Sequence, residues 1–334
     1  MTTRYGAVHQ NLKGPGDARP TALQIIKDEN LEDKWADKTV LITGCSSGIG
    51  IETAKALHET GATIYATARD LSKAKTALSS ILDSGRVHLL ELDLNSLASV
   101  RKAAQTFLAQ SKKLNVLILN AGIMACPEGR TADGHETQFG TNHLAHFLLI
   151  QHLLLPTTLE QSATPSSPSR VVVLASSAHR HAGINFDNLN HEGIYHPWAV
   201  YGQSKTANIY TASELERRYG SKNVHAYSVH PGLIVTGLMQ QLDQSTLDGW
   251  NAVPEISRAM KNPEQGAATT VWAATAKALE GSGGKYVEEC QISRPVGKEK
   301  FEEYEFGYAP HAFDEEKEKL LWEKSLELVK PFLA

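Results

Sequence analysis

The residues of this sequence best suited to chemistry are Tyr201 and Lys205, which lie four positions apart. In a helix this spacing places both side chains on one face. A free phenol has a pKa near ~10, but a fixed neighbouring cation stabilises the phenolate and lowers that pKa. The pair is therefore a candidate general acid. Taken alone it is weak evidence, because amphipathic helices often carry a packed tyrosine beside a solvated lysine.

A group of glycines predicts a phosphate-binding turn. Residues 38–43 form an apolar, β-branched run that ends at Gly44, and Gly48-Ile49-Gly50 then opens an alanine-rich helical stretch. This pattern predicts a strand, a turn and a helix. Gly44 would permit the tight turn, while Gly48 and Gly50 would let the backbone approach a pyrophosphate at the positive end of the helix. Although the spacing differs from G-x-G-x-x-G, we expect a dinucleotide to bind here.

The elements that must position these residues alternate between strand-like and helical patterns. We expect strands at residues 38–43, 63–68, 87–92, 114–119, 170–175, 224–229 and 285–288. Helical patterns begin near Ile49, Ser72, Ser96, His135 and Ala199. Such alternation predicts a doubly wound α/β fold, in which helices cover both faces of a parallel sheet.

The chain divides into one main domain and two extensions. Residues 1–37 are a polar lead-in with a short helix expected over residues 21–28, and residues 38–295 form the main domain. Residues 296–334 form a charged tail, which we expect to dock on the body as a helix. The apolar stripe of that helix would consist of Leu320, Leu321, Leu326 and Val329.

Composition excludes several classes of function. The 334 residues are 41% hydrophobic and 21% charged, with a net charge of −4 and no basic stripe, which argues against nucleic acid or an anionic membrane as partner. The longest apolar stretch, residues 147–155, is interrupted by polar residues, and the first ten residues lack an apolar signal core. Three cysteines without C-x-x-C spacing favour a reducing compartment, so we expect a cytoplasmic protein.

Considered together, these motifs resemble those of the short-chain dehydrogenase/reductase family. They follow the family order: residues 43–50, Asp93-Leu94, Asn120-Ala121-Gly122, Asn142, Ser176, Tyr201 with Lys205, and Pro231-Gly232. Residues 133–136 and 141–147 are similar to the retinol-dehydrogenase and WW-domain oxidoreductase branch, and to fungal ketoreductases. The resemblance covers roughly residues 35–295 and implies a Rossmann sheet of about seven strands in the order 3-2-1-4-5-6-7.

The resemblance implies a role for each catalytic residue. Tyr201 would be the general acid for carbonyl reduction or the base for alcohol oxidation, and Lys205 would lower its pKa and hold the nicotinamide ribose. Asn142 would hold a water that links Lys205 to solvent; alternatively, its side chain only bonds nearby backbone. Ser176 would donate a hydrogen bond to the substrate oxygen, with Ser177 as the reserve candidate.

The family pattern also implies the cofactor. NAD enzymes carry an acid where this chain has Ala68, and the following Arg69 suits a 2′-phosphate, so NADP(H) is favoured. Asp70 is the competing residue, but alignment by the strand end makes it a helix cap. The other residues expected at the cofactor are Gly44, Ser46, Ser47, Gly48, Ile49, Gly50, Asp93, Leu94, Asn120, Ala121, Gly122, Tyr201, Lys205, Pro231, Gly232 and Thr236.

The substrate site is expected to be apolar. Tyr195, Trp198, Met239 and Trp250 lie in loops that should flank the nicotinamide, which suggests a hydrophobic ketone, aldehyde or secondary alcohol. Histidines at positions 179, 181, 191 and 196 would line or cover its mouth. No metal site is expected, because no H-E-x-x-H or C-x-x-C accompanies them.

Two other functions remain open at this stage. A regulator could bind NADP(H) without catalysis, although regulators of that sort usually lose the tyrosine, lysine or serine. An epimerase or dehydratase of the extended branch would use the same tyrosine and lysine, but usually has another glycine spacing. The resemblance is compatible with either a monomer or a homodimer.

Overall fold

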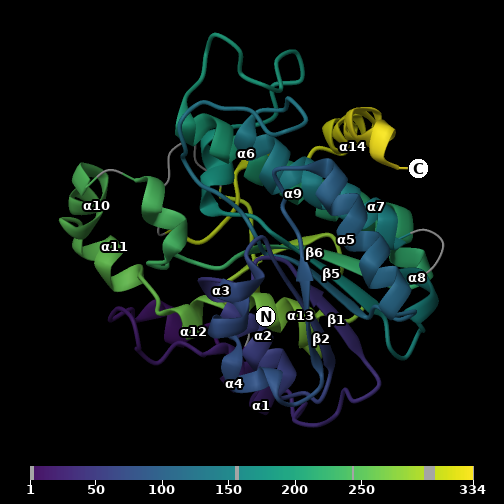
Figure 1. Ribbon diagram of the computed structural model, residues 1–334. Helices are drawn as coiled ribbons and strands as arrows, with labels where there is room; N and C mark the ends of the chain where they lie inside the picture. The colour runs from purple at the N-terminus through teal and green to yellow at the C-terminus, as the bar shows by residue number, and fades with distance from the viewer. Residues whose placement is uncertain (1–3, 155–157, 243, 297–304, 334) are drawn as a thin grey trace.

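The centre of the molecule is an eight-stranded sheet in the order β3-β2-β1-β4-β5-β6-β7-β8 (Figure 1). The computed structural model describes residues 4–154, 158–242, 244–296 and 305–333. All neighbouring strands are parallel except β7 and β8. The strands are β1 (Thr39–Ile42), β2 (Thr63–Ala68), β3 (Val87–Glu91), β4 (Val116–Leu119), β5 (Ser169–Leu174), β6 (Val224–His230), β7 (Lys285–Glu288) and β8 (Gln291–Ile292). The predicted doubly wound fold is confirmed.

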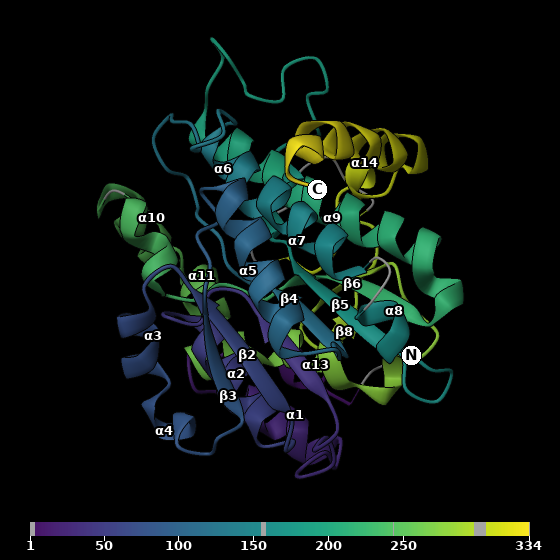
Figure 2. The same ribbon diagram turned by 45° about the vertical axis from the view of Figure 1, so that its right-hand side comes forward.

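Helices cover both faces of this sheet. Figure 2 shows α5 (Leu97–Gln110), α7 (Ala145–Leu154) and α9 (Pro197–Tyr219) on one side and α1 (Ala22–Asp28), α2 (Ile49–His58) and α13 (Ala268–Thr275) on the other. Strands β1, β4 and β5 are buried along their whole length, as a parallel sheet between two helical layers requires. Within β1, Leu41 packs into the first layer, while Val40 and Ile42 pack into the second. Two apolar cores result, one on each face.

The remaining helices are shorter or lie at the periphery. They are α3 (Leu71–Ala77), α4 (Ser79–Leu82), α6 (Thr137–Phe139), α8 (Leu159–Ser162), α10 (Gln244–Asn251), α11 (Pro254–Ala259), α12 (Pro263–Gly266) and α14 (Glu315–Val329). Helices α10 and α11 stand out from the body at the left of Figure 1. No helix among the described residues is both long enough and apolar enough to cross a membrane.

The eighth strand was not predicted from the sequence. Strand β8 pairs with β7 through a turn at Glu289 and Cys290, both of which have a φ of 54°. Two successive positive φ angles are typical of a two-residue hairpin turn whose twist matches the strands. Because such turns usually contain glycine or asparagine, a Glu-Cys pair gave no signal of it.

The N-terminal extension belongs to the core of the second helical layer. Helix α1 begins after Thr21, whose side chain accepts a hydrogen bond from the Gln24 amide, close to the predicted start. Ile25 and Ile26 are fully buried, and α1 packs against α2 and α13.

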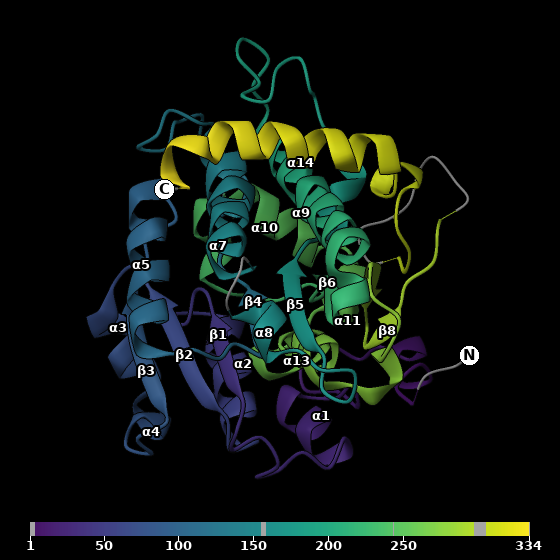
Figure 3. The same cartoon turned by 90° about the vertical axis from the view of Figure 1, so that its right-hand side faces the viewer.

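The C-terminal helix α14 lies across α7 and α9 (Figure 3). Trp322 packs edge-on against Phe147 of α7, with ring centres 4.9 Å apart, and Ser325 bonds His143 at 2.8 Å. The predicted stripe needs one correction. Leu320 does not belong to the buried face of α14, since its side chain is 39% exposed. The buried residues of this helix are Glu318, Leu321, Trp322, Ser325 and Val329.

Candidate active site

A cavity of about 750 Å³ opens at the carboxyl ends of strands β1 to β6. It lies where the strand order reverses, between β1 and β4, which is the usual ligand crevice of an open parallel sheet. Lining residues come from the loops after six strands and from α9, so residues far apart in the sequence meet there.

Tyr201, Lys205 and Ser176 all line this cavity. Helix α9 begins at Pro197, after His196, whose ring accepts a hydrogen bond from the Ala199 amide. The Lys205 Nζ donates to the Leu174 carbonyl oxygen at 3.1 Å and lies 5.5 Å from the centre of the Tyr201 ring. Burial lowers the pKa of the Lys205 ammonium to about 8. A phenol and a nearby, desolvated cation therefore share one wall of the cavity.

Asn142 lies behind this wall and does not line the cavity. It belongs to a π-helical turn, Gly140–Leu144, a distortion that is frequent at functional sites. Its Nδ2 donates to the Ile123 carbonyl and to Ser204 Oγ, and its Oδ1 accepts from the Ile123 amide. Both donors of the side chain are thus used on the protein. The Asn142 side chain holds the cavity wall in place, and the water relay stays a prediction.

Thr43 links the glycine turn to Asn142. Its Oγ1 accepts hydrogen bonds from the amides of Asn120 at 2.9 Å and Ala121 at 3.0 Å. The same hydroxyl lies 3.0 Å from Nε2 of His146, whose Nδ1 lies 3.1 Å from the Asn142 carbonyl oxygen. A hydroxyl that accepts two amide hydrogens has its own proton free for Nε2, so His146 carries its proton on Nδ1. Burial lowers the pKa of His146 to about 4, so this histidine is neutral.

Ser176 begins the turn that follows β5. Its Oγ accepts from the Ala178 amide at 3.2 Å, and Ser177 also lines the cavity. Nδ1 of His179 lies 2.6 Å from the Ser176 carbonyl oxygen, and its Nε2 accepts from the Ala309 amide at 3.1 Å. Because a carbonyl only accepts and an amide only donates, His179 carries its proton on Nδ1. The serine turn is thereby tied to the C-terminal segment.

The glycines of the turn after β1 have different roles. Gly44 has a φ of +78°, and a Cβ there would lie 2.9 Å from the Cα of Ala121. Gly48 has a φ of +65° and a ψ of −148°, a conformation open almost only to glycine, and it lines the cavity. Gly50 requires a correction, because it does not line the cavity. A Cβ on Gly50 would lie 2.2 Å from the Gly44 carbonyl oxygen, so this glycine lets α2 pack closely on the turn.

The end of the cavity near β2 and β3 contains Arg69, and Lys73 joins it there. Asp70 caps α3, accepting a hydrogen bond from the Lys73 amide at 3.0 Å, as alignment by the strand end predicts. Asn120 ties β4 to β1, because its Nδ2 donates to the Thr43 carbonyl at 2.8 Å. The other predicted cofactor residues that line the cavity are Gly44, Ser46, Ser47, Gly48, Ile49, Asp93, Leu94, Asn120, Ala121, Gly122, Pro231, Gly232 and Thr236.

The opposite end of the cavity is apolar. Trp198, Met239 and Trp250 line it as predicted, and the Trp198 ring centre lies 6.2 Å from that of Tyr201 and 5.9 Å from that of Trp250. Tyr195 requires a correction. Its hydroxyl donates to the Cys126 carbonyl at 2.7 Å, so it supports the cavity wall from behind instead of lining it.

None of the four loop histidines lines the cavity, and the prediction was wrong for the two that are buried, whereas His181 and His196 are exposed. His179 and His191 are buried in the protein, and His191 bonds Gln203 at 3.1 Å. Among the described residues, the histidine that lines the cavity is His230, at the end of β6.

Sequence reasoning missed several lining residues, including Lys73, Met124, Cys126, Thr137, Thr141 and His230. Met124, Cys126 and His230 sit at or just beyond carboxyl ends of strands, so the crevice rule could have found them. Thr137 and Thr141 lie one helical turn apart on a segment whose approach to the cavity has no local signal.

Comparison with known proteins identifies the family. The model of the short chain dehydrogenases matches residues 38–246. The chain belongs to the short-chain dehydrogenase family. Short-chain dehydrogenase/reductase prx1 of Penicillium roqueforti is 50% identical over 326 residues, which cover 98% of this chain and 95% of that protein. Retinol dehydrogenase 11 of Homo sapiens is 40% identical over 259 residues, covering 77% and 78%. The predicted retinol-dehydrogenase-like branch is confirmed.

Solved structures of other proteins share the fold. An uncharacterized protein from Mycobacterium paratuberculosis superposes with a TM-score of 0.68 and 32% identity, covering 94% of this chain and 98% of that one. The Pseudomonas aeruginosa RhlG/NADP active-site complex has a TM-score of 0.60 and 26% identity, covering 75% and 94%. The chain is therefore an oxidoreductase of a family that binds a nicotinamide cofactor.

Proposed function

We propose that this short-chain dehydrogenase reduces the carbonyl group of a hydrophobic ketone or aldehyde with NADPH, or runs the reverse oxidation. The observation that carries the proposal is one continuous cavity with Tyr201, Lys205 and Ser176 on its wall. The cavity has basic side chains, Arg69 and Lys73, at one end and an apolar end beyond the tyrosine.

Tyr201 acts as the general acid in this proposal. Its phenol donates a proton to the carbonyl oxygen, and the Lys205 ammonium stabilises the phenolate that remains. The Ser176 hydroxyl donates a hydrogen bond to the same oxygen as negative charge develops on it. In the oxidation direction the phenolate of Tyr201 removes the alcohol proton.

The cavity suits a nicotinamide dinucleotide. The N-cap of α2 is Gly48, which has no side chain to accept from the first amides of the helix, so these amides suit a phosphate. Pro231, Gly232 and Thr236 also line the cavity, where Thr236 lies beside Gly48, and they would hold the nicotinamide. When bound, the cofactor supplies or accepts the hydride.

The charge at the β2 end favours NADP over NAD. The guanidinium of Arg69 can contact a phosphate with two parallel donors, and Lys73 adds a second cation. The competing acid, Asp70, also lines the cavity, but its Oδ1 accepts a hydrogen bond from the Lys73 amide as the cap of α3. The similar RhlG structure is an NADP complex, which agrees with this choice.

The apolar end indicates the class of substrate. Met124, Trp198, Met239 and Trp250 surround Tyr201 with hydrocarbon and aromatic surface. Such a wall stabilises a bulky apolar molecule through burial of its surface and leaves the carbonyl as its polar handle. The similarity to retinol dehydrogenases supports a hydrophobic alcohol or aldehyde as the counterpart.

We further infer that the protein is a monomer. Helix α14 packs over α7 and α9, the helices that form dimer interfaces in many short-chain dehydrogenases. Light scattering after size exclusion should give one chain per particle, and a dimer would contradict this inference.

The test of the proposal follows NADPH absorbance against a panel of apolar ketones and aldehydes. We expect turnover that falls by roughly 10²-fold or more in Tyr201→Phe, while NADPH still binds. If the protein binds NADPH tightly but neither reduces any carbonyl with NADPH nor oxidises any alcohol with NADP+, the result would instead support the non-catalytic regulator.

Cofactor choice has its own test. Arg69→Ala and Lys73→Ala should each raise the KM for NADPH and leave that for NADH little changed. Lys75→Ala is the matched control, because Lys75 is exposed on the same helix and does not line the cavity. Equal effects on both cofactors would contradict the role of these cations at the 2′-phosphate.

A further inference from the structure

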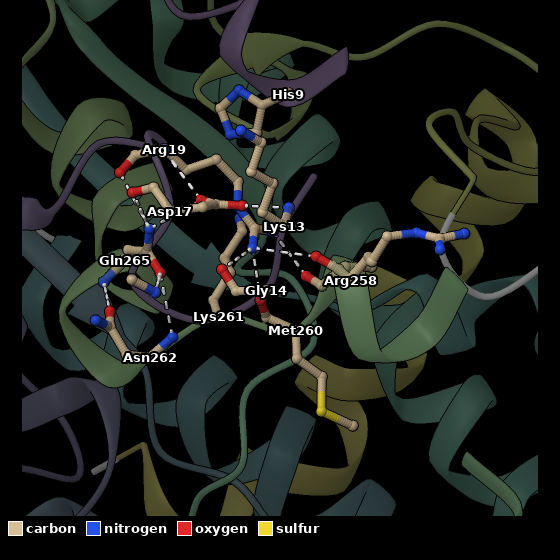
Figure 4. Close-up of polar contacts among 12 residues, drawn as sticks. His9, Lys13, Gly14, Asp17, Arg19, Arg258, Met260, Lys261, Asn262 and Gln265 are labelled. Atoms are coloured by element: carbon tan, nitrogen blue, oxygen red, sulfur yellow. Dashed lines mark hydrogen bonds and ion pairs between the residues drawn. The ribbon is translucent and has the colours of Figure 1, made fainter. Parts of the chain in front are cut away.

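The segment before α1 folds back against the loop that covers the substrate end of the cavity. Figure 4 shows residues from 9–19 in contact with residues 258–265. The Gly14 amide donates to the Arg258 carbonyl at 3.0 Å, and the Gly16 amide donates to Gln265 Oε1 at 2.8 Å. These contacts join parts of the chain about 250 positions apart, since the Gly16 and Gln265 positions differ by 249.

Arg19 is the centre of this contact. Its side chain is 1% exposed and pairs with Asp17, whose Oδ1 lies 2.8 Å from Arg19 Nε. The two terminal nitrogens donate to the carbonyls of Ala259 at 2.7 Å and Met260 at 2.5 Å, with longer contacts to the Gly14 and Arg258 carbonyls. A buried arginine thus satisfies the carbonyls at the end of α11, which have no partner within the helix.

Gln265 closes the contact from the other side. Its Nε2 donates to the main-chain oxygens of Asp17 and Arg19 at 3.1 and 3.2 Å. It also belongs to the capping box of α12 with Asn262. The residue that fixes the start of α12 therefore also fixes the N-terminal segment.

Lys261 connects these contacts to residues that line the cavity. It follows the carbonyls that Arg19 holds, and its side chain is 2% exposed. Its Nζ donates to the Pro231 carbonyl at 3.1 Å, and its own amide donates to the Leu233 carbonyl at 2.8 Å. A Cβ on Gly232 would lie 2.8 Å from the same Nζ, so lysine and glycine fit closely. Lys261 therefore supports the segment 231–234, whose residues line the cavity.

A second contact reaches Lys261 from the N-terminal segment. Glu289 Oε1 lies 3.0 Å from Lys261 Nζ, and Glu289 Oε2 lies 2.6 Å from Nε2 of His9. Burial alone would raise the pKa of Glu289, but the Lys261 charge and the His9 contact lower it well below its usual range. Lys261 is thus fixed by two sets of contacts outside the cavity: Arg19 holds the backbone that precedes it, and Glu289, which contacts His9, pairs with its ammonium.

We propose that residues 9–19 form an N-terminal clasp that positions the active-site loop, by which we mean residues 231–242 and 244–262. Arg19 fixes the end of α11, and Lys261 connects that end to Pro231 and Leu233 at the start of the loop. The loop carries Met239 and Trp250 to the substrate end of the cavity. Arg19 and Lys261 are positioning residues. The expected effect of these residues on the binding of NADPH and substrate rests on the proposed function, whereas their expected effect on hydrogen exchange in the loop does not.

The experiment compares Arg19→Ala with Arg4→Ala in the full chain. Arg4 lies in the same segment, but its side chain is 63% exposed and pairs with Asp28, away from the loop. Hydrogen exchange measured by mass spectrometry follows the loop amides, and NADPH fluorescence and steady-state kinetics follow the site. We expect exchange at residues 231–234 and 254–262 to rise roughly tenfold in Arg19→Ala and to stay unchanged in Arg4→Ala, because loss of charged hydrogen bonds shifts an equilibrium by at least that factor.

Kinetics should separate positioning from mere stability. In Arg19→Ala the KM for the carbonyl and the Kd for NADPH should rise roughly tenfold at temperatures well below unfolding, with a smaller change in kcat. Exchange that increases in residues 4–30 but not in residues 231–262 would overturn the proposal. If the wild-type protein turns over no carbonyl, the proposed function fails, and the exchange data still decide whether the clasp exists.

A second variant guards against misfolding. Arg19→Ala leaves the Asp17 carboxylate buried without its partner, which alone could unfold the protein. The double variant Asp17→Asn with Arg19→Gln removes both charges and keeps polar side chains, so it should fold. The glutamine has no guanidinium to donate to the carbonyls of both Ala259 and Met260, so hydrogen exchange of the loop amides should still rise in this variant. A folded double variant with wild-type loop exchange would also overturn the proposal.

Discussion

Replacing Gly50 by alanine should destabilise the protein, although the same change usually stabilises a helix. Alanine is favoured over glycine inside helices by about 0.5–1 kcal/mol. At Gly50, however, the added Cβ would lie 2.2 Å from the Gly44 carbonyl oxygen and 2.6 Å from Asn120 Nδ2. Real Cβ contacts essentially never fall under 3.0 Å, so the backbone of Gly44 or the start of α2 must move.

The neighbours of Gly50 have little room to move. Gly44 has a positive φ and already lies against Ala121, while Asn120 is held by its bonds to Thr43. Overpacking of this kind costs about 1–3 kcal/mol, and we expect the upper end of that range because the nearest atom belongs to the backbone. The displaced turn also contains Gly48, so NADPH should bind more weakly.

Gly249→Ala provides the matched control. Gly249 lies in α10, and a Cβ there would meet no atom within 4 Å, so this substitution should be neutral or slightly stabilising. Thermal unfolding followed by circular dichroism, with NADPH titration of each variant, measures both effects. A Gly50→Ala protein that melts at or above the wild-type temperature and binds NADPH normally would refute the packing argument.

Three further changes test the residues around the site and the packing of helix α14. Lys205→Met should abolish turnover yet stabilise the protein by roughly 3 kcal/mol at pH 7, because burial lowers the folded-state pKa to about 8 from 10.5. Between pH 8 and 10.5 residue 205 carries a proton in the unfolded chain but not in the folded one, so the stability of the wild-type protein rises with pH over this range. A difference in melting temperature between wild type and Lys205→Met that is the same at pH 7 and pH 10.5 would contradict this account. Thr43→Val should cost roughly 1–3 kcal/mol in urea unfolding, since it leaves the half-buried amides of Asn120 and Ala121 without their acceptor; a loss below ~0.5 kcal/mol would mean that those amides find other partners. Trp322→Ala should lower the melting temperature through a loss of roughly 3–5 kcal/mol while leaving the kcat per folded molecule unchanged, and a melting temperature equal to wild type would show that α14 does not stabilise the body.

Much of the fold could be predicted from local patterns. Residues 63–68 and 285–288 form strands with the predicted bounds, because β-branched and aromatic residues in short segments between turn residues suit a strand wherever it is placed. The cap role of Asp70 followed from the end of β2, since a capping acid needs only the helix that it begins. The tail helix was predicted, but Leu320 was assigned to its buried face although Trp322 and Ser325 occupy that face.

The sequence by itself determined the order of strands and helices, the glycine turn and the presence of Tyr201, Lys205 and Ser176, because these depend on neighbours within a few positions. Only the tertiary structure decided which of the predicted residues reach the cavity. Gly50 in the first turn of α2 and Tyr195 in the loop before α9 lie close in sequence to lining residues but do not line the cavity, whereas Lys73 and His230 line it without any motif. The hydrogen bonds from Arg19 to the carbonyls of Ala259 and Met260 also depend on the tertiary structure. Contacts between such distant positions depend on how whole layers pack, and a single sequence carries no local signal of that packing.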